Sequence, residues 1–169
     1  MKSALESGIR LGGVFEIVCR DKFGNVKWKD TAKNLVTTAG LQHVLDTVFS
    51  GGTAVATWYV GLLSATPTLA AGDTLASHAG WTEFTSYADN RKEYVEVRSN
   101  QTLSNTASKA SFAINANSSS IGGAFLASAA TGTTGTLMSE AAFTGGNKAA
   151  DSGDTLEVTY TFTGADDGA

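Results

Sequence analysis

TLEVTYTF, residues 155–162, is the stretch that decides the fold, because apolar and polar side chains alternate along all of it. Thr and Glu fill the odd positions, and the even positions hold Leu156, Val158, Tyr160 and Phe162. Successive side chains of a strand point to opposite faces, so this pattern predicts a β-strand with one face on a core and the other in water. The turn residues DSGD (151–154) precede it.

Other segments of the chain have the same character and are separated by turn residues. GVFEIVCR (13–20) and NVKWKD (25–30) meet at a Gly-Asn turn, which predicts a hairpin. The remaining predicted strands are TWYVGLL (57–63), KEYVEVRS (92–99), KASFAINA (109–116), SIGGAFLAS (120–128) and GTLMSEAAF (135–143). About eight strands at regular spacing predict a mainly β fold, an antiparallel β-sandwich that is jelly-roll-like or immunoglobulin-like.

One segment has a helical period instead. Its apolar stripe, at the spacing i, i+3, i+4 and i+7, is formed by Leu41, Val44, Leu45 and Val48. Thr37 or Thr38 can cap the helix, and Gly51-Gly52 is expected to end it. We therefore expect one short inserted helix whose apolar stripe packs on a sheet.

Length and composition favour one domain. The chain has 169 residues, of which 42% are apolar and only 17% are charged, with 19 Gly and 1 Pro. This composition is typical of short strands joined by many turns and is unlike that of a helical bundle. Residues 1–12 are polar and lack a period. We predict an extended N-terminal arm over residues 1–12, ordered by a partner, and a single β-sandwich domain over residues 13–169.

The charge distribution is uneven. The formal net charge is −4, which disfavours general nucleic-acid binding because that function needs a basic face. Residues 1–33 carry seven basic and four acidic residues, whereas residues 34–169 carry five basic and twelve acidic ones. Two readings are open. Either the basic front of one copy attracts the acidic body of another, or the asymmetry reflects chance and solvation.

The single cysteine and the start of the chain restrict the cellular setting. Cys19 excludes an intramolecular disulfide, and its alternation with Phe15 and Ile17 places it in the core. The opening MKSALESGIRLGG lacks the apolar region of a signal peptide, and no run reaches the roughly 18 apolar residues of a membrane helix. We expect a protein that is made in a cytoplasm and does not enter a membrane.

No recognisable catalytic or metal-binding constellation is present. His43 and His78 lack partners at zinc spacing, and the sequence contains neither GxSxG nor a phosphate-binding GxxxxGK[ST]. Glu93 and Glu96 fall on opposite faces of a predicted strand, which excludes a close carboxylate pair. We predict no enzyme activity, no catalytic residue, no cofactor and no metal. A site assembled only by the fold, for instance at His78 or Glu83, is the remaining enzymatic reading.

Residues 64–90 form the longest stretch without a period, and they contain the aromatic residues Trp81, Phe84 and Tyr87. Long loops with aromatic content are packed excursions or interaction surfaces. Exposed aromatics could bind sugar, whereas a place in the core or in a subunit contact is the more common role of such residues.

Four segments resemble a known family. They are NLVTTAGLQHVLDTVFSGG (34–52), TWYVGLLS (57–64), DTLASHAGWTEFTSY (73–87) with the following Arg91, and SGDTLEVTYTF (152–162). Together they resemble the capsid decoration, or cement, proteins of tailed bacteriophages of the short-tailed type. This resemblance implies a virion structural protein on the outer capsid surface, made in the bacterial host cytoplasm, which stabilises the mature head. It implies no catalytic residues.

The resemblance also implies partners, namely the major capsid protein and further copies of the chain, with a homotrimer favoured and with no nucleic acid or membrane. The residues expected to contact capsid or protomer are Lys2 and Arg10 of the arm, together with Trp81, Phe84, Tyr87 and Arg91. The alternative function is a tail- or head-fibre module that binds host-surface glycans. That alternative predicts an exposed Trp81 and Tyr87 in a groove.

Overall fold

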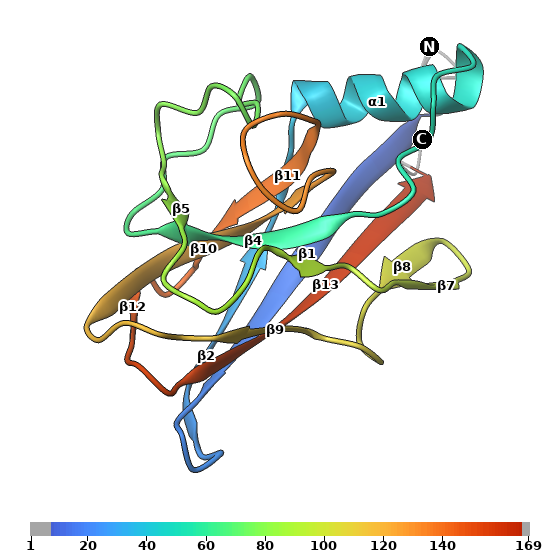
Figure 1. The fold of residues 1–169 in the computed structure, drawn as a ribbon. Helices are drawn as coiled ribbons and strands as arrows, with labels where there is room; N and C mark the ends of the chain where they lie inside the picture. The colour runs from blue at the N-terminus through green and yellow to red at the C-terminus, as the bar shows by residue number, and fades with distance from the viewer. Residues whose placement is uncertain (1–7, 167–169) are drawn as a thin grey trace, which may run out of the picture.

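The strand predicted from residues 155–162 is the centre of the first of two sheets in the computed structural model, which describes residues 8–166 (Figure 1). This sheet has the order β2-β1-β13-β8-β7, and β9 also pairs with β13. Its strands are β1 (Ile9–Arg20), β2 (Val26–Lys33), β7 (Val97–Ser99), β8 (Thr102–Ser104), β9 (Ala110–Ala113) and β13 (Thr155–Asp166). Every pairing in it is antiparallel.

The second sheet has the order β3-β11-β10-β4-β5, and its pairings are also antiparallel. Two further strands attach to it, since β12 pairs with β10 and β6 pairs with β4. Its strands are β3 (Leu35–Val36), β4 (Tyr59–Ser64), β5 (Glu83–Phe84), β6 (Lys92–Glu93), β10 (Ser119–Ala127), β11 (Leu137–Ala142) and β12 (Lys148–Ala150). The protein is therefore mainly β, and its two antiparallel sheets form a β-sandwich, as the sequence predicts.

The main core lies between the two sheets. Phe15 and Tyr160 face each other across the β1–β13 ladder with ring centroids 4.0 Å apart, and both are fully buried. Leu62 on β4 and Ala124 on β10 contribute to the same core from the second sheet. Cys19 is buried there as predicted, and its burial raises the pKa of the thiol to about 11. The apolar alternation of β1 and β13 thus faces the second sheet.

A smaller core lies on the outer side of the second sheet. It contains Phe125 of β10, Leu137 of β11 and, from the long segment before β5, Leu75 and Trp81. The first part of the aromatic-rich segment of residues 64–90 therefore packs over this sheet, while its residues Phe84 and Tyr87 join the main core. This arrangement agrees with the reading of the segment as a packed excursion. We refer to residues 65–91 as the cover loop.

Several predicted boundaries need correction. The predicted arm of residues 1–12 is too long, because β1 begins at Ile9 and pairs with the end of β13. Residues 1–7 lie outside the described residues. The predicted strand of residues 92–99 is two strands, β6 and β7, which belong to different sheets. Tyr94 lies between them, and its hydroxyl donates to the carbonyls of Leu103 and Tyr160.

The predicted helix is present as α1 (Thr38–Phe49). Thr37 is its N-cap, and its hydroxyl accepts a hydrogen bond from the Gly40 amide at 3.0 Å. The same hydroxyl donates to the Leu137 carbonyl, which ties the start of the helix to β11. Figure 1 shows α1 across one end of the sandwich, with the β1–β2 turn at the other end.

Candidate interaction surface

The orientation of α1 is set by a glycine. Gly40 is buried against β11, and a Cβ at this position would lie 2.4 Å from the Met138 carbonyl oxygen. A helix turns about 100° per residue, so Val44 lies only about 40° from Gly40 around the axis and also packs against the core. Leu45 lies about 140° from Gly40 and therefore faces away from the sandwich.

Most of the predicted apolar stripe is consequently exposed. Leu45, Val48 and Phe49 are 57%, 64% and 76% exposed, and Leu41 is exposed beside them. The expectation that this stripe packs on a sheet is wrong except at Val44, because the close approach at Gly40 turns the stripe outward. We call Leu41, Leu45, Val48 and Phe49 the α1 face.

The α1 face is almost free of charge. Asp46 is the one charged residue of the helix, and neither an acidic first turn nor a basic last turn is present. Solvent-exposed helices normally carry charged and polar residues on their outer face. A contiguous exposed apolar patch of this kind marks an interaction surface. The α1 face is therefore the first candidate site on the molecule.

An apolar pocket of about 290 Å³ lies between α1 and the end of the sandwich. Val44 and Val48 line it from the helix, and Ala54 and Val55 line it from the segment that follows. Leu126 and Phe162 belong to the two sheets at its base. Its polar lining includes His43, which meets the ring of Trp58 edge-on, and Glu96. The pocket is suited to one apolar side chain rather than to a drug-sized ligand.

The aromatic residues predicted to make external contacts are buried inside the chain. Trp81, Phe84 and Tyr87 each retain 7% or less of their exposure, and Arg91 is equally buried. Side chains buried within one copy are not available on its surface, so this burial argues against the predicted contact of these four residues with capsid or a neighbouring protomer. Trp81 packs on the outer side of the second sheet, whereas Phe84 and Tyr87 belong to the main core, so the groove of exposed Trp81 and Tyr87 that glycan binding requires is not formed.

Trp81 is held by two buried carboxyl groups. Its indole N–H donates to Glu140 at 2.8 Å and to Asp73 at 3.2 Å. The Ala70 amide donates to the same two residues, and the His78 ring stacks on Trp81 at 3.6 Å. Burial, and then the charge of Asp73, raises the pKa of Glu140 to about 7. The cluster is an anchor between the cover loop and β11.

Arg91 forms a second anchor. Its guanidinium donates to both carboxylate oxygens of Glu83 at 2.7 Å, and also to the carbonyls of Ala129 and Gly132. The same group lies 5.1 Å from the ring centroid of Phe125. Arg91 therefore joins the cover loop to the segment between β10 and β11. The sequence places a basic residue here but gives no sign of these distant acceptors.

Of the two residues predicted to make contacts from the arm, the structure describes Arg10 but not Lys2. Arg10 is exposed on β1, opposite Ala165 of β13, and so it belongs to the first sheet rather than to an arm. Lys2 lies outside the described residues.

Sequence reasoning missed the α1 face as a site, although the low charge of residues 38–49 is a signal that could have found it.

Within residues 8–166, no group of three or more His, Cys, Asp or Glu side chains is arranged to hold a metal ion. No helix within the described residues is long and apolar enough to span a membrane. No protein-family model matches the chain, and a comparison with curated proteins gives no match either.

Proposed function

We propose that this protein is a bacteriophage virion protein that binds the outer surface of the capsid and stabilises the mature head. The observation that carries the proposal is the α1 face, an uncharged apolar surface on a rigid helix. The resemblance of four sequence segments to capsid decoration proteins supplies the partner, which is the major capsid protein.

The chemistry of the surface suits this role. A decoration protein works through many modest contacts repeated over a symmetric shell, and repetition multiplies their effect. A broad apolar face serves such a contact without a deep ligand site. The rival function, a fibre module that binds glycans, relies on Trp81 and Tyr87, which are buried.

The test has two parts. Quantitative mass spectrometry of purified virions compares the copy number of this chain with that of the major capsid protein. A number of the same order supports a place on the shell, whereas a number that fits one tail ring, or absence from the particle, contradicts it.

The second part asks which surface binds. Capsids that lack the protein are mixed with the wild type, with the double variant Leu45→Asp and Val48→Asp, and with Val97→Asp as control. Val97 is as exposed as Val48 but lies on β7. We expect loss of binding for the α1 variant alone. Equal binding by all three proteins would assign the contact to another surface.

A further inference from the structure

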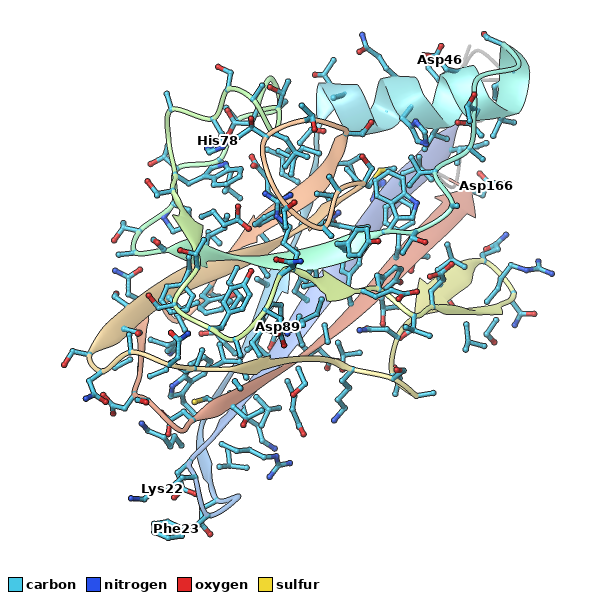
Figure 2. The ribbon with its side chains drawn as sticks, in the orientation of Figure 1. Lys22, Phe23, Asp46, His78, Asp89 and Asp166 are labelled. Atoms are coloured by element: carbon cyan, nitrogen blue, oxygen red, sulfur yellow. The ribbon has the colours of Figure 1, made fainter. Side chains whose placement is uncertain are left out.

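The tip of the β1–β2 hairpin carries an unusually exposed aromatic residue. Phe23 is 79% exposed, the highest value among the large apolar side chains that the structure describes. Figure 2 shows Phe23 and Lys22 together at the end of the hairpin, away from the rest of the body. The Lys22 ammonium lies 5.2 Å from the centroid of the Phe23 ring.

The turn that presents Phe23 is held rigidly. The Asp21 carboxylate accepts hydrogen bonds from the amides of Phe23 and Asn25 at 2.8 and 2.9 Å. The Asp21 amide donates to the Asn25 carbonyl, and Arg20 donates to the Gly24 carbonyl. The Asn25 side-chain amide also donates to the Asp21 carboxylate, and this bond, followed by those from the two backbone amides, lowers the pKa of Asp21 below its ordinary value. A fixed turn that keeps an aromatic ring in water is already organised for binding, because little conformational entropy remains to be lost.

The pocket beside α1 is complementary to the exposed Phe23 side chain. The pocket beside α1 has apolar walls and a volume of about 290 Å³, which suits a single aromatic side chain. Aromatic residues that fill such pockets are the usual anchors of protein interfaces. The pocket borders α1, and α1 and the hairpin tip lie at opposite ends of the molecule (Figure 1), so the pocket and the tip cannot meet within one copy.

The charges around the two elements are complementary. Glu96 lines the pocket, and Asp46, an exposed residue outside the pocket lining, is the only charged residue of α1. The C-terminal end of α1 adds partial negative charge, and its last turn contains no basic residue. The hairpin tip presents the exposed Lys22 next to Phe23, while the Asp21 carboxylate is engaged within the turn. An aromatic ring beside a cation thus matches an apolar pocket with an acidic surround.

We propose that Phe23 at the hairpin tip of one copy inserts into the pocket beside α1 of a second copy, with Lys22 facing the acidic surround. The contact is heterologous, because two different surfaces meet, so it closes into a ring or continues head to tail. This inference does not depend on capsid binding. It agrees with one of the two readings of the charge distribution, in which the basic residues 1–33 of one copy attract the acidic remainder of another.

The experiment is sedimentation equilibrium of the full chain up to millimolar concentration. We expect concentration-dependent association of the wild type. Phe23→Ala removes the ring, and Ala54→Arg blocks the pocket with a bulky cation, so each weakens association about tenfold or more. The matched controls are Ile9→Ala, an equally exposed apolar site, and Thr53→Arg, next to Ala54 but outside the pocket lining. Both controls should associate like the wild type.

Mixing the two defective variants gives the decisive result. Phe23→Ala retains the pocket and Ala54→Arg retains the tip, so a one-to-one mixture should form a heterodimer and stop there. Near-ultraviolet circular dichroism confirms that both variants are folded. A wild type that stays monomeric at millimolar concentration, a Phe23→Ala variant that associates like the wild type, or a mixture that stays monomeric would each overturn the proposal.

Discussion

The cover loop and α1 both connect strands of the second sheet, and both are rich in apolar side chains, yet the loop buries these side chains and the helix exposes them. The loop buries Trp81, Phe84 and Tyr87, whereas the helix exposes Leu45, Val48 and Phe49. The loop is irregular apart from the two-residue strand β5, whereas the helix is regular throughout. Regular secondary structure is therefore not what decides which apolar residues are hidden in this protein.

Polar anchors account for the difference. The loop is fixed at Trp81 and Arg91 by hydrogen bonds to partners on or between the strands of the second sheet. These bonds satisfy buried polar groups and hold the backbone where the rings must pack. The helix is fixed at Thr37 and Gly40, both at its first turn, and those contacts set its rotation. This rotation of the helix decides which way its later side chains point.

The largest effect is expected from loss of the Arg91 anchor. Arg91→Ala leaves Glu83 and the carbonyls of Ala129 and Gly132 without their donor. Breaking a buried pair costs about 3–5 kcal/mol, and the partial exposure of Glu83 places the loss at about 3 kcal/mol. Chemical denaturation measures it. The exposed Arg98→Ala is the control, with a change within about 0.5 kcal/mol. A loss below 1 kcal/mol for Arg91→Ala would show that the Arg91 anchor is not required for the stability of the fold.

The second effect is a dependence of stability on pH at the Glu140 anchor. The pKa of Glu140 is raised from 4.5 to about 7 on folding, so the folded state keeps a proton that the unfolded state has lost. Stability is therefore fully present below pH 4.5 and falls as the pH rises through about 7. The total loss is on the order of 3 kcal/mol. Asp21 and Asp151 have lowered pKa values, and their contributions change only on the acid side of this window.

Thermal denaturation from pH 4.5 to 8, with Glu140→Gln beside the wild type, checks this dependence. The amide cannot ionise, so the variant should lose most of the slope over the window. Glu93→Gln is the control, because Glu93 is exposed on β6 and should leave the slope intact. If the wild type were equally stable across this range, Glu140 would be ionised in the folded protein and would hold Trp81 as a carboxylate.

The sequence was informative where a pattern is local. Alternation over residues 155–162 predicts β13, and a hydroxyl followed by a 3.6-residue period predicts α1 with its cap. It was misleading where burial depends on distant partners. Nothing near Trp81 in the chain indicates that Glu140, on β11, will hold it. Nothing near Leu45 indicates that the Met138 carbonyl will turn the helix at Gly40. Apolar periodicity shows that a stripe exists, but a close contact across the fold decides which way it faces.

The smallest effect is the sharpest test of that last point, because it compares neighbours on one helix. Val44→Ala removes two methyl groups that pack against the core, so we expect a loss of about 1 kcal/mol. Leu45→Ala removes more atoms, yet those atoms face water, so the change should stay within about 0.5 kcal/mol. Alanine favours the helix in both variants, which removes propensity as an explanation. Urea denaturation of the dilute protein measures both values. A larger loss at Leu45 than at Val44 would mean that the α1 face is covered within a single copy, and its assignment as an interaction surface would fail.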